Sequence, residues 1–273
     1  MYSPPTTEAD TDRMTAAHTR AVAALDATPA GPLVWGYQGR TLGRRADHPL
    51  HGACWLRLHL APDGTEGGKL WEGTEQAAHL FTAVRKPALH AIRDTATAEY
   101  AYRAELTQYI HEPALSPEPV LRAEVDLHDS WFTAIRADLE TIAATPTERT
   151  SVRQQWIDRA VPTFTGRPAP QITDWTCAHG DFHLANITTS AVILDWEGFG
   201  MAPRGWDAAL LYAYTLLAPA TAARIHAAFT DILNTEAGQT AQLIVAADLL
   251  QSTSRGDHPE LTGPLRELIT TLP

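Results

Sequence analysis

Lysine and cysteine are scarce in this sequence, and long hydrophobic runs are missing. Only Lys69 and Lys86 can supply an ammonium group, because every other basic residue is an arginine. Cys54 and Cys177 lie far apart without metal-type spacing, which predicts two buried thiols rather than a disulfide or a metal site. No stretch approaches the roughly 18 apolar residues of a membrane span, and no basic leader precedes an apolar segment at the N-terminus. These features predict a cytoplasmic protein without a membrane partner.

Basic residues are also fewer than acidic ones. Lys plus Arg number 21 against 32 Asp plus Glu, which gives a formal net charge of −11. Binding to a nucleic-acid backbone needs a basic surface, so this balance argues against a nucleic-acid partner and suits a cationic small molecule. Acidic residues of the last third either line such a cationic-substrate site or form solvated surface: Asp231, Glu236, Asp248, Asp257 and Glu260.

A proline-rich stretch between His111 and Pro119 divides the sequence. A helix cannot run through its three prolines, so we place a domain boundary here, between residues 1–110 and residues 111–273. In the first part, strand-like runs accompany helices expected at Thr6–Ala27, after Thr74 and at Thr95–Ile110. In the second part, a β-rich segment at Thr176–Glu197 interrupts helices expected at Ser130–Ala143, Arg149–Arg159, Trp206–Leu233, Gln239–Gln251 and Leu265–Leu272.

The chemically informative residues lie between His179 and Glu197. HGDFHLANI at 179–187 is followed by VILDWE at 192–197, which brings Asp181, Asn186 and Asp195 into one loop, turn and strand context. The apolar run Ala191–Leu194 predicts a short buried strand that ends at Asp195. A buried carboxylate is costly unless it faces a cation or several donors, and a divalent metal is the natural partner.

Phosphoryl transfer needs these groups. One carboxylate accepts the hydroxyl proton, while an amide oxygen and a second carboxylate hold Mg²⁺ on the nucleotide phosphates. The spacing of Asp181 and Asn186 equals the D-x-x-x-x-N of the protein-kinase catalytic loop, with Gly180 in place of arginine. The whole HGDxHxxN…DWE pattern resembles the aminoglycoside phosphotransferase and choline kinase family of small-molecule kinases. The match runs from His179 to about Leu211 and is faint before residue 111.

This resemblance implies an α+β, two-lobed protein-kinase-like fold, with a small mixed β/α N-lobe and a larger, mainly helical C-lobe. It implies Asp181 as the catalytic base, Asn186 and Asp195 as Mg²⁺ ligands, and ATP or GTP as co-substrate between the lobes. The acceptor would be a small hydroxylated molecule, with an aminoglycoside or other antibiotic favoured and choline-like amines, amino-alcohols, sugars and nucleosides open. Asp207 is interpreted as a helix cap and loop support. The chain segment between Asn186 and Asp195 is short for this family, and a turn at 188–190 would close it into a hairpin.

The nucleotide-binding groups of the N-lobe are less evident. A phosphate-anchoring lysine on a strand should pair with a glutamate on the following helix. Lys86 and Glu105 are our choice, although Pro87 is awkward in a paired strand, and Lys69 beside the Gly67-Gly68 turn is the fallback. Three glycines form either a nucleotide-covering loop or an ordinary hairpin turn: Gly36, Gly39 and Gly43.

Two alternative functions remain open. His179, Asp181 and His183 alternate, so on a strand they would face one way and could ligate zinc in a metal-dependent hydrolase. A catalytically weak pseudokinase or nucleotide-binding module would keep the kinase fold while losing phosphate transfer.

Overall fold

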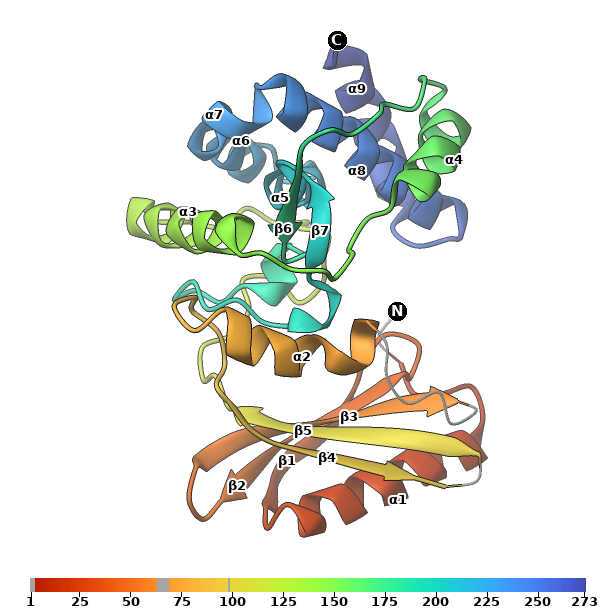
Figure 1. Ribbon diagram of the computed structural model, residues 1–273, viewed down its shortest axis with the longest axis vertical. Coiled ribbons are helices and arrows are strands. Elements are labelled where there is room, and N and C mark those ends of the chain that lie inside the picture. The colour runs from red at the N-terminus through yellow and green to blue at the C-terminus, as the bar shows by residue number, and fades with distance from the viewer. Residues whose placement is uncertain (1–2, 63–68, 98) are drawn as a thin grey trace. The chain divides into compact units, whose positions relative to one another are not determined.

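The computed structural model describes residues 3–62, 69–97 and 99–273 (Figure 1). In chain order, the first helices and strands are α1 (Glu8–Ala24), β1 (Thr28–Trp35), β2 (Thr41–His48), β3 (Gly52–Pro62), α2 (Lys69–Leu80), β4 (Leu89–Ala96) and β5 (Tyr100–Gln108). They are followed by α3 (Asp129–Ala144), α4 (Gln154–Thr165), β6 (Trp175–Ala178), β7 (Gly200–Pro203), α5 (Trp206–Tyr214), α6 (Pro219–Ala228), α7 (Thr230–Leu233), α8 (Glu236–Ser254) and α9 (Thr262–Thr271).

The chain forms two compact units. The N-terminal unit comprises Met1–His79 and Pro87–His111, and the C-terminal unit comprises Leu80–Lys86 and Glu112–Pro273. One boundary between these units falls at 111/112, in the proline-containing stretch. The sequence gives no hint that the short segment Leu80–Lys86 belongs to the C-terminal unit.

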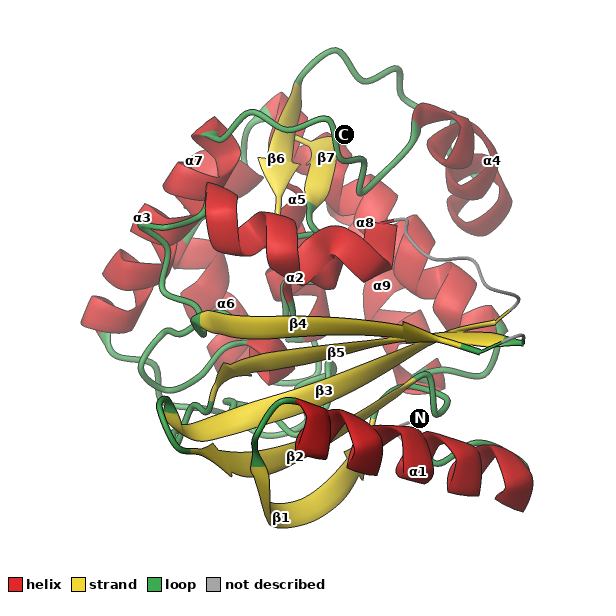
Figure 2. Ribbon diagram, turned by 60° about the horizontal axis from the view of Figure 1, so that its bottom comes forward, coloured by secondary structure: helices red, strands yellow, loops and turns green. Residues whose placement is uncertain are grey.

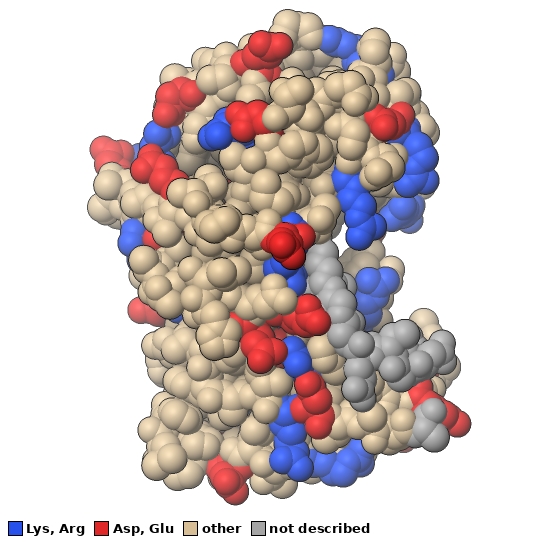
Figure 3. Space-filling view, viewed as in Figure 1, with Lys and Arg blue, Asp and Glu red and all other residues tan. Residues whose placement is uncertain are grey.

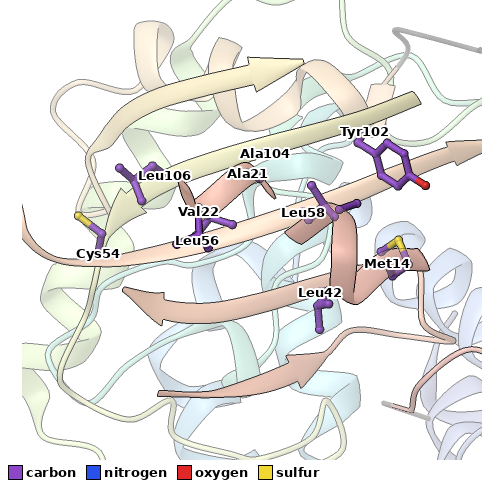
Figure 4. Close-up of a cluster of buried hydrophobic side chains, with 11 residues drawn as sticks. Met14, Ala21, Val22, Leu42, Cys54, Leu56, Leu58, Tyr102, Ala104 and Leu106 are labelled. Carbon is purple, nitrogen blue, oxygen red and sulfur yellow. The ribbon is translucent and has the colours of Figure 1, made fainter. Parts of the chain in front are cut away.

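The N-terminal unit is an antiparallel sheet with strand order β1-β2-β3-β5-β4. Helix α1 covers one face of this sheet, and α2 lies over the other (Figure 2). Apolar side chains at alternate positions of β3 and β5 face α1, because successive side chains of a strand point to opposite faces. They form a buried cluster with the inner side of α1 (Figure 4), which includes Met14, Val22, Leu42, Cys54, Leu56, Leu58, Tyr102, Ala104 and Leu106.

Helix α1 forms where apolar spacing and a capping residue predict it. The Thr7 hydroxyl accepts a hydrogen bond from the Asp10 backbone N–H at 3.1 Å and caps the N-terminus. Met14, Ala17 and Ala21 are buried and recur at the three- and four-residue spacing of one helical face.

The helix expected at Thr95–Ile110 is wrong, because this region contains the end of β4 and all of β5. A hydrogen bond from the Thr97 backbone N–H to the Tyr100 carbonyl closes the turn between these strands, without the glycine or asparagine that marks many hairpins. Residues 101–106 are all buried. Apolar and polar residues alternate from Tyr102 to Thr107, as expected of a strand, but Leu106, Tyr109 and Ile110 also recur at the three- and four-residue spacing of a helix, and the prediction followed that spacing.

The C-terminal unit is mainly helical. Helix α8 packs against α4, α5 and α9, and the two-stranded β6–β7 sheet lies beside α3. Most expected helices are present, but Trp206–Leu233 is divided into α5, α6 and α7. The predicted α+β class, with a small mixed N-terminal part and a larger helical C-terminal part, is confirmed.

Other features agree with the composition. Cys54 and Cys177 are free and buried, as predicted, and burial raises the pKa of the Cys177 thiol to about 12. Across the described ranges, no helix combines the length and apolar character needed to cross a bilayer. On the face drawn in Figure 3, acidic and basic side chains are interspersed.

Candidate active site

Asp181 and Asn186 are brought together in the loop that follows β6. The Asn186 side chain lies in a short 3-10 helix, Leu184–Asn186, and is 8% exposed. Its amide nitrogen donates to the Asp181 backbone carbonyl at 2.9 Å and to the Asp181 carboxylate at 3.2 Å. Because the nitrogen is used in this way, the amide oxygen of Asn186 is the atom that the residue can offer to a cation.

The Asp181 carboxylate is held as an anion and remains accessible. Its side chain is 51% exposed, and one oxygen lies 3.3 Å from Nε2 of His183. Burial opposes ionisation, but His183, His179 and Asn186 outweigh it and hold the pKa of Asp181 below its usual value. An accessible, ionised carboxylate is suited to accept a proton from a hydroxyl group.

Asp207 fixes the backbone of the same loop. Its carboxylate accepts hydrogen bonds from the backbone N–H groups of His179 at 2.7 Å and Gly180 at 3.0 Å. Loop support by Asp207 is therefore confirmed, but the helix-cap interpretation is wrong. The N-cap residue of α5 is Gly205, whereas Asp207 lies in the first turn and turns its carboxylate toward the loop. Burial raises the pKa of Asp207 despite these donors.

Glycine is required at position 180. Gly180 has φ +90°, and a Cβ atom there would lie 2.4 Å from the Ser151 hydroxyl and 2.7 Å from the Gly198 carbonyl. The kinase-type arginine would therefore be strained and obstructed at this position. The local packing therefore requires glycine here, where the protein-kinase loop has arginine.

His179 connects the Asp181 loop to the segment that carries Asp195. The His179 Nε2 atom is 2.8 Å from the Leu194 carbonyl oxygen, and the backbone N–H of Asp181 points to Nδ1 at 3.4 Å. Nε2 of His179 thus faces the Leu194 carbonyl, and Nδ1 faces the backbone N–H of Asp181. Both ring nitrogens of His179 thus have partners within the protein, which argues against the zinc alternative. Within the described ranges, no three His, Cys, Asp or Glu side chains are grouped to hold a metal.

A narrow hairpin places Asp195 next to Asn186. The Leu194 backbone N–H donates to the Asn186 carbonyl at 2.8 Å, and Ile187 pairs with Ile193 in an isolated bridge. The Ala191 N–H closes the turn by donating to the Thr188 carbonyl at 3.0 Å. The short segment between Asn186 and Asp195 is therefore closed by a turn, as expected. The strand expected at Ala191–Leu194 is reduced to an isolated bridge at Ile193.

The oxygen atoms of Asn186 and Asp195 suit Mg²⁺, which prefers carboxylate and carbonyl oxygen ligands. Asp195 has φ +58°, an uncommon conformation for a residue other than glycine, directly before the 3-10 helix Trp196–Gly198. Arg149 supports that helix from outside, because its guanidinium donates to the Glu197 carbonyl at 2.8 Å and to the Phe199 carbonyl at 3.0 Å.

The residues chosen for the N-terminal unit need correction. Glu105 lies in β5 rather than on a helix, and its carboxylate is 3.2 Å from Nε2 of His59. Lys86 is not in a strand, because β4 begins after Pro87, which lacks the N–H that a paired strand requires. Burial lowers the pKa of Lys86. Lys69 is the first residue of α2, and the Gly67-Gly68 turn lies outside the described residues.

The three candidate glycines do not form one loop. Gly36 and Gly39 belong to the turn between β1 and β2, where the Gly39 N–H donates to the Gly36 carbonyl at 3.2 Å. Gly43 instead lies within β2, and the Trp55 ring fills the space that its side chain would need. A hairpin turn therefore explains the first two glycines, and close packing explains the third.

Arg57 is a further candidate in the N-terminal unit, which sequence reasoning missed because it searched for a lysine. Arg57 lies on β3 directly opposite Glu105 on β5, so the two side chains leave the same face of the sheet. Glu105 is 2% exposed, and one of its carboxylate oxygens is buried without a hydrogen-bond partner. Arg57 and His59 alternate with buried leucines in the sequence, and this alternation was the signal that could have placed both polar side chains on one face of a strand.

Comparison with known proteins identifies the fold. No family model matches the chain, and no curated protein matches it by sequence. Solved structures match over most of its length. A thermostable mutant of aminoglycoside phosphotransferase APH(4)-Ia, in ternary complex with AMP-PNP and hygromycin B, gives a TM-score of 0.64 at 11% identity and covers 93% of this chain and 97% of that one.

Two further kinases show the same similarity. Amicoumacin kinase hAmiN, in complex with AMP-PNP, Ca²⁺ and Ami, gives a TM-score of 0.59 at 10% identity, covering 98% of this chain and 97% of that chain. Aminoglycoside-3'-phosphotransferase of type VIII gives 0.52 at 15% identity, covering 84% and 98%. The chain therefore has the protein-kinase-like fold of aminoglycoside phosphotransferases that the HGDxHxxN…DWE pattern predicts.

Proposed function

We propose that this protein is a Mg²⁺-dependent phosphotransferase that moves the γ-phosphate of ATP or GTP to a hydroxyl group of a small molecule. The observation that carries the proposal is the hydrogen-bonded position of Asn186. Its side chain holds Asp181, and its backbone carbonyl holds the hairpin that ends at Asp195. The base and both oxygen ligands of a phosphoryl-transfer site thus belong to one connected structure.

Each residue would have a distinct task. Asp181 would orient the acceptor hydroxyl and accept its proton as the new bond to phosphorus forms. Asn186 and Asp195 would hold Mg²⁺, which supplies neutralising charge on the nucleotide phosphates when bound. Asp207 would keep the Asp181 loop in place through its two backbone hydrogen bonds.

The proposal is tested by transfer of label from γ-labelled ATP or GTP to a panel of hydroxylated amines and neutral sugars. We expect a labelled small molecule with the wild-type protein and none with Asp181→Asn. Nucleotide binding without transfer to any acceptor of the panel would instead support the pseudokinase alternative. The solved kinases of this fold make an aminoglycoside or another antibiotic the favoured first acceptors.

The phosphate-contacting cation of the N-terminal unit is proposed to be Arg57, supported by its position opposite the buried Glu105. Lys86 keeps its place as the alternative. Because an arginine can donate two parallel hydrogen bonds to a phosphate, Arg57→Met is expected to raise the Kd for ATP about tenfold. Calorimetry on Arg57→Met, Arg57→Lys and Lys86→Met separates the two. A larger loss in Lys86→Met than in Arg57→Met would return the role to Lys86.

We further propose that Asp248 on α8 favours a cationic acceptor. Burial and the nearby charge of Asp181 raise the pKa of Asp248 to about 6. Below that pH the Asp248 carboxyl is neutral and attracts no ammonium group. The KM for an amine acceptor should therefore fall as pH rises through about 6, and Asp248→Asn should remove this dependence and raise KM about tenfold at pH 7.5.

Stability should respond to pH in the opposite direction. A folded-state pKa above the unfolded value means that the folded protein binds more protons, so Asp248 lowers the free energy of unfolding as pH rises from about 4 to about 6. Asp248→Asn should thus stabilise the protein at pH 7.5 and have little effect at pH 4. Asp231→Asn, at an exposed carboxylate paired with Arg136, is the matched control. Equal KM changes in both variants would contradict the role of Asp248.

A further inference from the structure

The segment Leu80–Lys86, called the strap below, packs against the turn that follows Asp195. Phe81 is fully buried, and its ring centroid lies 4.9 Å from that of Trp196 and 5.0 Å from that of Phe199. Val84, also buried, turns the strap back by donating its N–H to the Phe81 carbonyl at 3.2 Å. The strap begins at Leu80, the last residue of α2, and ends before β4, yet it belongs to the C-terminal unit.

The strap is joined directly to the hairpin by Arg85. Its backbone carbonyl accepts a hydrogen bond from the Ile193 N–H at 2.8 Å. Its guanidinium Nε lies 3.3 Å from a carboxylate oxygen of Asp138, which is on α3 and only 3% exposed. A buried carboxylate needs a charged partner, so an ion pair without a hydrogen bond holds the Arg85 side chain at Asp138, while the backbone of Arg85 holds Ile193.

These contacts surround Asp195 on both sides in sequence. Ile193 lies two residues before it and is bound by Arg85, while Trp196 directly follows it and is packed by Phe81. The left-handed backbone of Asp195, φ +58°, persists only when its surroundings hold it. The strap supplies that restraint, because it contacts residues on both sides of Asp195 in the sequence.

We infer that the strap positions Asp195, and that Asp138 acts through Arg85 as a positioning residue for the metal site. The consequence for the metal rests on the proposed function, in which Asp195 is a ligand. The support of the hairpin itself does not depend on that function. Asp138 and Arg85 touch neither metal nor substrate in this account, so their removal should act through the order of the hairpin.

The first test is hydrogen exchange on the metal-free protein. Arg85→Met and Asp138→Asn should each speed exchange of the Ile193 and Leu194 amides about tenfold, while amides of β6 keep their wild-type rates. The double variant should be no faster than either single variant, because both break one connection. Arg136 lies on α3, like Asp138, but pairs with Asp231, so Arg136→Met should leave the exchange rates of the Ile193 and Leu194 amides unchanged. Arg85 is 41% exposed, so its variant remains informative if Asp138→Asn does not fold.

The second readout is binding of Mn²⁺, an EPR-visible substitute for Mg²⁺, in the presence of AMP-PNP. Arg85→Met should weaken Mn²⁺ binding about tenfold, in the range found for residues that orient metal ligands, and Arg85→Lys should recover part of the loss. Unchanged exchange at Ile193 and Leu194 would overturn the inference. Faster exchange with unchanged Mn²⁺ affinity would also overturn it, because the hairpin order would not matter to the ligand. If the wild-type protein binds no Mn²⁺, the proposed function fails, and the exchange rates alone decide whether the strap supports the hairpin.

Discussion

Replacement of Asp181 by alanine is expected to lower the rate of phosphate transfer about 10²–10⁴-fold, the usual contribution of a general base. Nucleotide binding should survive, because the proposed Mg²⁺ ligands, Asn186 and Asp195, remain. The expected pattern is therefore a collapse of kcat with little change in the Kd for MgATP. Rates of product formation and calorimetric titration on the same preparation measure the two quantities.

The shape-matched variant is Asp181→Asn. Its side-chain oxygen can still accept the hydrogen bond that Asn186 donates at 3.2 Å, so the loop should keep its geometry while the base is lost. Asp181→Ala and Asp181→Asn should then be equally slow. If Asp181→Asn retained a turnover within about threefold of wild type, proton transfer to Asp181 would be excluded as a large contribution to the rate.

Replacement of Asp195 by alanine is expected to abolish Mg²⁺-dependent nucleotide binding. Loss of an outer residue that orients a ligand typically costs 10–100-fold in metal affinity, so removal of a ligand itself should cost more than about 100-fold. Any weak binding of metal-free nucleotide should be unchanged. Titrations of ATP with and without Mg²⁺ measure this difference directly.

Asn186→Ala and Asp174→Asn complete that comparison. The first should resemble Asp195→Ala, since it removes the other oxygen ligand, and it should also loosen the Asp181 loop. The second changes an exposed carboxylate that pairs with Arg204 and should behave as wild type. Normal Mg²⁺-dependent binding by Asp195→Ala would remove Asp195 from the metal site.

The loop that holds Asp181 and Asn186 could be predicted from sequence because these residues are close in sequence. Asp181 and Asn186 are five residues apart, and a local turn with a short 3-10 helix brings their side chains together. The same holds for α1, whose apolar spacing and Thr7 cap are local properties. Where the structure depends on neighbours within a few residues, pattern and structure agree.

The pairing of Arg57 with Glu105 could not be found in this way. Arg57 and Glu105 are paired by strand register, and a register between distant strands is not encoded in local spacing. The region of β5 alternates between apolar and polar residues, but Leu106, Tyr109 and Ile110 also have helical spacing, and local spacing alone does not decide between the two. The strap was hidden for a similar reason, because the partners of Phe81 and Arg85 lie more than fifty residues away in the sequence.

The central claim is that this chain binds a nucleotide through a metal held at Asp195, and a thermal-shift titration tests it most directly. Saturation at about 100 times Kd adds about 2.7 kcal/mol to the free energy of unfolding, which corresponds to a rise in Tm of about 5–11 °C for a protein of this size. We predict this rise for the wild-type protein with MgATP or MgGTP, and no comparable rise without Mg²⁺ or in Asp195→Ala. A wild-type Tm that stays constant with both nucleotides in the presence of Mg²⁺ would contradict the account.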